Sequence, residues 1–196
     1  MKIIVGAVIA VAIVAICAVL APKIFVSIDD LCAEGNYIEA YQKASDDEKL
    51  DVLAENIIAV LSQESSDGLK DPSSFILRDA WYYAFMHDDG AIGGYAVLYL
   101  SGANSFGAKV SNYWAYALGE DGEWNYIGSV DVSYDEYDDE LGDMLTKMIV
   151  QAGMEKGEQL SKKQVKRINS QFEADTLYQV DAIDWDDVDT SQFPEG

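Results

Sequence analysis

The sequence is poor in the residues from which most catalytic and metal sites are built. Its 196 residues include a single histidine, His87, and two cysteines, Cys17 and Cys32. A hydrolytic triad needs its histidine beside a nucleophile and an acid, and a zinc site needs clustered histidine or cysteine ligands. His87 instead precedes Asp88-Asp89-Gly90, a turn sequence. We therefore expect no enzymatic activity and no resident cofactor.

The cysteines and glycines exclude two further classes. Cys17 lies inside an apolar run and Cys32 follows it alone, so no intramolecular disulfide framework is possible. A small secreted module stapled by disulfides is thereby excluded. Gly90, Gly93 and Gly94 match neither the dinucleotide-binding nor the nucleotide-phosphate pattern. Nothing in the sequence predicts a phosphate-binding loop.

Basic residues are also scarce. The chain has 13 Lys and Arg against 35 Asp and Glu, which gives a net charge of −22. Nucleic-acid binding depends on neutralising phosphates with Lys and Arg, so we expect no nucleic-acid partner. An acidic surface attracts divalent cations and basic partners and also keeps a domain soluble.

Calcium is the metal that the acidic residues fit best. Asp131, Ser133, Asp135, Tyr137 and Asp139 alternate as in a calcium loop. However, Glu136 occupies the position where the loop needs glycine, and Gly142 the position where it needs a bidentate glutamate. The same acids suit the start of a helix, where the helix dipole favours negative charge. We expect weak Ca²⁺ binding at most.

The most informative stretch is an apolar run from Ile3 to Ala21. It contains no charged residue, and as a helix it spans about 28 Å, close to the ~30 Å hydrocarbon core of a bilayer. A cleaved signal peptide is the alternative, but its apolar region is shorter, and a cut after Ala21 leaves Pro22 first and Val19 at a position that needs a small residue. We interpret residues 1–23 as a transmembrane anchor, with secretion after cleavage as the alternative.

The orientation follows from the lengths on either side of this run. Only Met1-Lys2 precede it, whereas a large domain follows, and Lys2 and Lys23 give little charge bias. We expect a single-pass protein of the cell membrane with its C-terminal domain outside the cytoplasm.

Three regions follow the anchor. Residues 24–66 show helical periodicity as a membrane-proximal hairpin, and Ser45 to Glu48 form a capping box. Residues 67–175 alternate as strands over 75–86, 92–100, 110–118 and 124–131, a four-stranded antiparallel meander. The first strand places Phe75, Leu77, Trp81, Tyr83 and Phe85 on one face. Helices before and after the meander indicate an α+β class.

The C-terminal part predicts two helices and a tail. A capping box at Ser133 opens a helix with apolar residues at helical spacing, namely Tyr137, Leu141, Met144, Leu145 and Met148. A further box at Ser161 opens a short helix carrying Val165, Ile168 and Phe172. Residues 176–196 form an acidic tail. Its interspersed apolar residues predict that it docks on the domain.

Two turn-rich stretches resemble a known class of domain. Leu69-Lys70-Asp71-Pro72-Ser73-Ser74-Phe75 leads into the first strand, and Asn104-Ser105-Phe106-Gly107-Ala108-Lys109-Val110 leads into the third. Together they resemble small extracytoplasmic domains, found mainly in Gram-positive bacteria, that follow a signal or anchor and have no assigned activity. The resemblance implies a compact α+β domain over roughly residues 66–131 and carries no catalytic residues over.

Two groups of residues are candidates for binding. Aromatic residues are concentrated in the meander, and an open sheet face would let them stack on glycans, whereas a covered face would make them core. The candidates are Trp81, Tyr83, Trp114, Tyr116 and Trp124. The second group is a basic cluster that either meets anionic lipid headgroups or pairs with the acidic tail. It comprises Lys162, Lys163, Lys166 and Arg167.

These features predict a membrane-anchored extracytoplasmic protein that acts as a non-catalytic binding or interaction module, with an unknown protein or a cell-wall component as ligand. One alternative is a cell-wall-active hydrolase with a carboxylate pair, whose convergence a sequence cannot reveal. Another is a structural component of a surface or secretion assembly.

Overall fold

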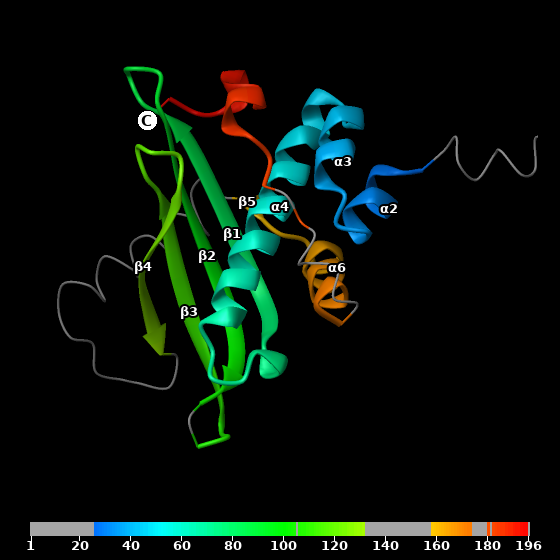
Figure 1. Cartoon of the computed structure of the whole chain (residues 1–196). Coiled ribbons are helices and arrows are strands. Elements are labelled where there is room, and N and C mark those ends of the chain that lie inside the picture. The colour runs from blue at the N-terminus through cyan, green and yellow to red at the C-terminus, as the bar shows by residue number, and fades with distance from the viewer. Residues whose placement is uncertain (1–25, 105, 132–157, 174–179, 181, 196) are drawn as a thin grey trace, which may run out of the picture.

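The helices gather on one face of an antiparallel sheet in the computed structural model, which describes residues 26–104, 106–131, 158–173, 180 and 182–195 (Figure 1). Three helices come first, α2 (Ile28–Ala33), α3 (Tyr37–Lys43) and α4 (Asp46–Asp67), and α6 (Lys162–Glu173) follows the strands. Short 3₁₀ turns occur at η1 (Pro72–Ser74), η3 (Trp185–Asp187) and η4 (Thr190–Gln192). The predicted α+β class is confirmed.

Helix α4 is the centre of the helical layer. It begins with the predicted capping box, in which the Ser45 amide donates to Glu48 Oε2 at 3.0 Å. The helix contacts β1 and β2 on one side and α2, α3 and α6 on the other. Residues around its whole circumference are therefore buried, including the polar Glu55 and Asn56.

The sheet has the predicted meander and one extra strand. Its strands are β1 (Ile76–Met86), β2 (Ile92–Ala103), β3 (Lys109–Leu118), β4 (Trp124–Asp131) and β5 (Glu158–Gln159). Their order is β4-β3-β2-β1-β5, and every neighbouring pair is antiparallel. The four-stranded meander is confirmed. The two-residue β5, which pairs with Trp81 and Tyr82, was too short to predict.

A β-bulge divides β1 into two parts and makes one prediction wrong. The register with β2 shifts between Leu77 and Asp79. Because one inserted residue reverses the alternation of side chains, Leu77 faces the helices whereas Trp81 and Phe85 face the other side of the sheet. Beyond the bulge it is Tyr82 that joins the helical core. The expected single aromatic face of this strand therefore does not exist.

The described part of the acidic tail packs on the domain, as its apolar residues predict. The side chains of Ile183, Val188 and Phe193 are buried in the main core. The Pro194 carbonyl accepts a hydrogen bond from the Met86 amide at 3.1 Å, which extends the edge of β1. The tail thus completes the core between β1 and the helices, near the end of β1 beside the C-terminus marked in Figure 1.

Several predictions fall on residues outside the described ranges. These are the anchor at residues 1–23, the helix opened by Ser133 and the calcium-loop residues after Asp131. In the ranges that are described, no helix is long and apolar enough to span a bilayer. The same ranges contain no group of His, Cys, Asp and Glu side chains arranged to hold a metal ion.

Candidate functional site

Helix α6 carries the predicted basic cluster, and its start is defined by local chemistry. Ser161 and Gln164 form the predicted capping box, with the Ser161 amide donating to Gln164 Oε1 at 2.8 Å. Val165 and Ile168 on the apolar face of α6 are buried. The Phe172 ring packs against the ring of Phe75, the residue just before β1. With this face directed into the core, the basic residues are left at the flanks and surface of the helix.

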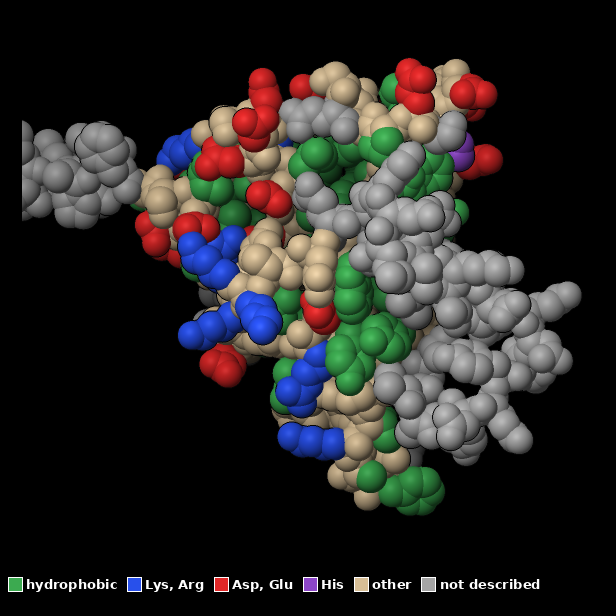
Figure 2. Space-filling view, turned by 180° about the vertical axis from the view of Figure 1, so that it is seen from behind, with side chains coloured by type: hydrophobic (Ala, Val, Ile, Leu, Met, Phe, Trp, Pro, Cys, Tyr) green, Lys and Arg blue, Asp and Glu red, His purple; other side chains and the backbone are tan. Residues whose placement is uncertain are grey.

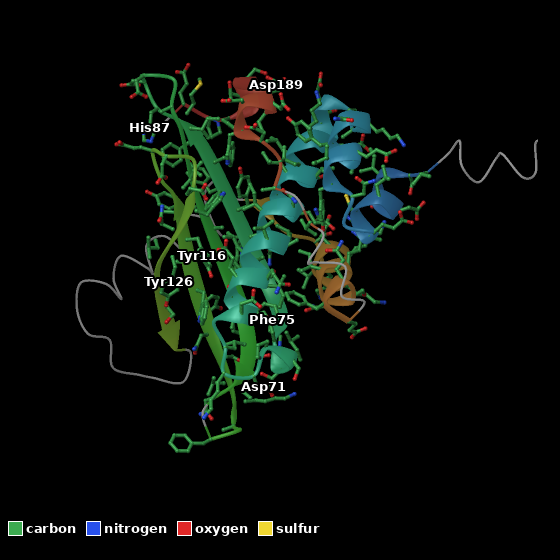
Figure 3. All side chains as sticks on the ribbon, in the orientation of Figure 1. Asp71, Phe75, His87, Tyr116, Tyr126 and Asp189 are labelled. Atoms are coloured by element: carbon green, nitrogen blue, oxygen red, sulfur yellow. The ribbon has the colours of Figure 1, made fainter. Side chains whose placement is uncertain are left out.

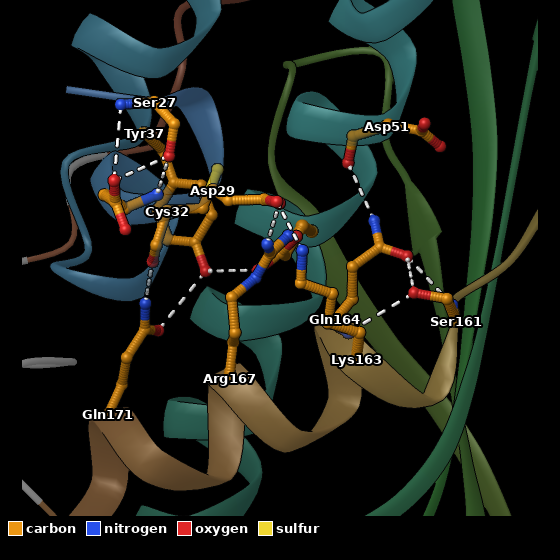
Figure 4. A network of polar contacts seen from close by, with 12 residues as sticks. Ser27, Asp29, Cys32, Tyr37, Asp51, Ser161, Lys163, Gln164, Arg167 and Gln171 are labelled. Carbon is orange, nitrogen blue, oxygen red and sulfur yellow. Dashed lines mark hydrogen bonds and ion pairs between the residues drawn. The ribbon is translucent and has the colours of Figure 1, made fainter. Parts of the chain in front are cut away.

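Two of the four bases bind carboxylates of other helices. Arg167 Nε donates to Glu55 Oε1 at 2.8 Å, and its two Nη atoms pair with Glu55 Oε2 and Asp29 Oδ1. Lys163 pairs with the second oxygen of Asp29 (Figure 4). We call Asp29, Glu55, Lys163 and Arg167 the α6 clamp. It joins α2, α4 and α6, and its four formal charges cancel.

Glu55 makes the clamp more than a surface ion pair. Glu55 is 1% exposed, so water does not solvate its carboxylate. The negative charge is stabilised instead by the guanidinium of Arg167. Asp29 is half exposed, and hydrogen bonds from Lys163 and Arg167 lower its carboxyl pKa. The guanidinium of Arg167 therefore binds two carboxylates, the buried one of Glu55 and the half-exposed one of Asp29.

Neutral groups fill the space behind the clamp. The Tyr37 hydroxyl lies 3.3 Å from Gln171 Oε1 and 3.5 Å from Glu55 Oε1, and Gln171 Nε2 donates to the Cys32 carbonyl (Figure 4). Burial raises the pKa of the Tyr37 hydroxyl well above its usual value, and the charge of Glu55 adds to this effect. Burial likewise raises the pKa of the Cys32 thiol to about 12. Both groups are held in their neutral forms.

The clamp contains two converging carboxylates, the arrangement that the alternative of a hydrolase would need. Asp29 and Glu55 bind the same guanidinium and both line a hollow of about 720 Å³. A glycosidase of this type needs one carboxyl group with a raised pKa to act as general acid. Lys163 and Arg167 lower the pKa of Asp29, which is the opposite shift. The pairing therefore favours the charged form of Asp29, which does not have the raised pKa of a general acid.

The other two bases of α6 line a separate hollow of about 650 Å³ between α6, β1 and β5, which we call the α6 groove. Lys162 and Lys166 are exposed there, together with Arg78 of β1. Within the described ranges none of these three side chains forms an ion pair, and Arg78 Nε donates to a serine hydroxyl. The groove also contains Asp79, whose carboxylate accepts a hydrogen bond from Gln159 at 2.8 Å.

The predicted aromatic candidates do not form one surface. Trp114, Tyr116 and Trp124 face the helices and belong to the main core or pack against it. Trp81 and Tyr83 lie on the opposite face of the sheet, in a second cluster around Val97. The sheet therefore separates the five candidates into two groups that no single ligand contacts together.

The group facing the helices is part of the folded core. The Tyr116 hydroxyl is 2.8 Å from Ser65 Oγ of α4, and burial raises its pKa to about 12. Trp124 packs at 6.4 Å between ring centroids against Trp185 of the C-terminal segment. Tyr116 is therefore closed to a ligand, whereas Trp114 and Trp124 are partly buried against the same core.

His87 lies where the sequence places it, in the exposed turn after β1, at the same end of the molecule as Asp189 (Figure 3). Its ring meets the edge of Phe85 at 4.8 Å between centroids. It lines a hollow of about 860 Å³ with acidic turn residues and Trp185. His87 is therefore a solvent-exposed histidine in a turn, as the sequence predicts.

The sequence did not point to Glu55, which belongs to the α6 clamp. It also did not point to Tyr37 and Gln171, the neutral residues beside the clamp. A weak signal existed for Glu55, because it lies among the apolar residues of a helix whose other charges are near its ends. The partners are far apart in the chain, so no local pattern relates them.

Comparisons with known proteins give no additional guide. No protein-family model matches the chain, and neither the curated proteins nor the solved structures contain a match.

Proposed function

We propose that the protein is a single-pass, extracytoplasmic, non-catalytic binding module, and that its α6 groove meets anionic lipid headgroups of the membrane that anchors it. The first support is the short distance between the apolar run and the folded domain. Only residues 22–26 separate Ala21 from Ser27, the N-cap of α2. Fully extended, five residues span about 18 Å, so α2 stays close to the membrane surface.

The observation that carries the proposal is the α6 clamp. Asp29 lies in the first turn of α2, and Lys163 and Arg167 bind it from α6. The helix nearest to the anchor is thereby fixed to the helix that bears the free bases. A domain held in this way presents the α6 groove on the side of the molecule that faces the membrane.

Charge distribution supports the same orientation. The net charge of −22 repels an anionic surface, but charges in solution interact over a screening length of only about 8 Å. Lys162, Lys166 and Arg78 are the bases near α6 that the described carboxylates leave unneutralised. Each base close to an anionic bilayer contributes about 1 kcal/mol. In Figure 2 the Lys and Arg side chains in view lie mainly along one flank, and Asp and Glu predominate at the upper end.

Protease treatment of intact cells and of spheroplasts tests the location. We expect a C-terminal tag on the full chain to be protected in intact cells behind a cell wall and to be lost when spheroplasts are treated. The tag should remain with the membrane fraction in untreated samples. Protection in both preparations would place the domain in the cytoplasm and contradict the proposal.

Chemical acetylation of the full-length protein in vesicles tests the lipid contact. We compare vesicles of phosphatidylcholine with vesicles of equal parts phosphatidylcholine and phosphatidylglycerol. Lys162 and Lys166 should be acetylated several-fold more slowly in the vesicles that contain phosphatidylglycerol. High salt should remove this difference between the two vesicle compositions. Lys70 and Lys109, which are exposed and do not line the α6 groove, serve as internal controls. Equal rates of Lys162 and Lys166 in both lipids would exclude the contact.

A further inference from the structure

Arg78 is the extra residue of the bulge in β1. Its two neighbours pair with consecutive residues of β2, so Arg78 itself has no partner on that strand. A bulge gives up regular pairing at one residue and redirects the side chain there, and bulges are common beside functional sites. Arg78 is exposed and lines the α6 groove. The bulge thus supplies the groove with an arginine that takes no part in the regular pairing of the sheet.

One hydrogen bond fixes the guanidinium of Arg78. Its Nε donates to Ser101 Oγ at 3.0 Å, and Ser101 of β2 is only 3% exposed. No carboxylate of the described residues pairs with this guanidinium, so both Nη groups are available to a ligand. A guanidinium is a rigid planar fork of N–H donors. Such a fork binds two oxygens of one phosphate group at the same time.

The other bases of the groove come from α6. Lys162 and Lys166 are four residues apart, so they lie on the same face of the helix, and both are exposed. Two carboxylates also line the groove. Both oxygens of Asp79 already accept hydrogen bonds, one from the β5 glutamine at 2.8 Å and one from the next main-chain amide at 3.0 Å. Glu173 lies seven residues beyond Lys166, about 10 Å along the helix.

We propose that the α6 groove binds the phosphodiester of one anionic lipid headgroup, with Arg78 as the residue that recognises it and Ser101 as the residue that positions Arg78. This role of Arg78 rests on the proposed lipid contact and names the group that makes it. The two free phosphate oxygens accept from Nη1 and Nη2, and Lys162 and Lys166 add positive charge. The same lysines repel the cationic choline group, so the groove favours phosphatidylglycerol over phosphatidylcholine.

Modification of arginine by phenylglyoxal tests the contact in the full-length protein. Mass spectrometry follows each arginine in vesicles of phosphatidylcholine and in vesicles of equal parts phosphatidylcholine and phosphatidylglycerol. Arg78 should react several-fold more slowly in the anionic vesicles. Arg167, whose guanidinium binds Glu55 and Asp29, is the internal control and should react slowly in both. Equal rates at Arg78 in the two vesicle compositions would overturn the proposal.

A third sample separates a lipid headgroup from free phosphate. It contains phosphatidylcholine vesicles and inorganic phosphate, with chloride at the same ionic strength as its control. Inorganic phosphate should protect Arg78 several-fold less than phosphatidylglycerol does, because only the bilayer holds its phosphate groups next to the groove. Equal protection by inorganic phosphate would overturn the assignment to a lipid.

Two variants separate recognition by the fork from attraction by charge. Arg78→Lys keeps the positive charge without the planar fork, and Ser101→Ala removes the hydroxyl that holds Nε. In each variant, phosphatidylglycerol should protect Lys162 and Lys166 from acetylation several-fold less than in wild type. Ser129→Ala, which removes an exposed hydroxyl from β4, is the matched control and should keep the wild-type protection. Urea denaturation verifies that each variant is folded.

The same data distinguish this role of Arg78 from the lipid contact on which it rests. Absence of protection at Lys162 and Lys166 in the wild type would mean that the lipid contact itself is wrong. Protection in the wild type that persists unchanged in Arg78→Lys would leave the lipid contact in place. It would also show that the contact depends on charge alone, and would overturn recognition by Arg78.

Discussion

The side-chain amide of Asn169 on α6 hydrogen-bonds both main-chain groups of Leu77 on β1. Its Oδ1 accepts from the Leu77 amide at 3.0 Å, and its Nδ2 donates to the Leu77 carbonyl at 2.9 Å. Strand β5 pairs with this edge only at Trp81 and Tyr82, so Leu77 lies beyond its reach. One amide side chain thus replaces a strand at the edge of the sheet.

Replacing Asn169 with leucine should destabilise the domain. Leu77 is 1% exposed, so its N–H and C=O groups would lose their partners away from water. Each unsatisfied buried group costs about 1–3 kcal/mol. Urea denaturation measures the change in unfolding free energy. Ser170→Ala, one position along and exposed, should stay within about 0.5 kcal/mol of wild type. Equal effects of the two substitutions would argue against this role of the amide.

Arg167→Met should be among the most destabilising single changes on α6. It leaves the carboxylate of Glu55 buried without its cation, and breaking a buried pair in this way costs about 3–5 kcal/mol. The matched control is Lys166→Met, which removes the same charge from an exposed position and should change stability by less than about 0.5 kcal/mol. Chemical denaturation of both variants provides the comparison.

The double variant Glu55→Leu/Arg167→Met separates charge pairing from packing. Well-packed apolar replacements of a buried ion pair are often neutral, so the double variant should regain most of the stability lost by Arg167→Met. Additive losses from the two substitutions would show that the pair contributes through contacts other than its charges.

Cys32 should be unreactive toward thiol reagents in the native state. Its residue is 1% exposed, and burial raises the pKa of its thiol to about 12. At pH 8 the reactive thiolate is then about 10⁻⁴ of the total. In a Cys17→Ser variant, labelling by a disulfide reagent should be slow until urea is added and then complete. Full labelling of the native protein on mixing would contradict the assigned burial.

Acid should weaken the contribution of Asp29. The hydrogen bonds of Lys163 and Arg167 hold its folded-state pKa below the ordinary value of 3.8. Its stabilising effect is therefore fully present above about pH 3.8 and is lost as the pH falls through the lower folded value. Because the side chain is 54% exposed, solvent screening limits the effect to below about 1 kcal/mol.

The measurement for Asp29 is the difference in unfolding free energy between wild type and Asp29→Asn as a function of pH. This difference should be constant near neutrality and should shrink on acidification. Asp51→Asn, an exposed position on α4 outside the clamp, serves as control. A difference that grows with acid would have the wrong sign for a lowered pKa.

Phe193→Ala tests whether the C-terminal segment belongs to the core. The Phe193 side chain is 6% exposed and packs against Trp185. Removing a buried aromatic ring costs about 3–5 kcal/mol, which thermal or urea unfolding detects readily. Glu195→Ala, two residues along and exposed, should have little effect. Equal stability of the two variants would mean that the tail contributes no core packing.

The features that the sequence determined are local ones. The capping boxes at Ser45 and Ser161 were predicted and are present, because each consists of residues three apart whose bonds form within one turn. The order and pairing of β1 to β4 follow from alternation and turn residues for the same reason. The packing of the C-terminal tail was also expected, since apolar residues in an acidic segment have few alternatives to burial.

Only the tertiary structure decided how these elements meet. Glu55 and Arg167 are separated by 112 positions, and no spacing rule relates them. The bulge beyond Leu77 is a single inserted residue, yet it reverses which face Trp81 and Phe85 occupy, because the side-chain period of a strand is two. Local patterns fix the elements of this protein, whereas the pairing of distant charges and the face of each aromatic ring depend on register and packing across the whole chain.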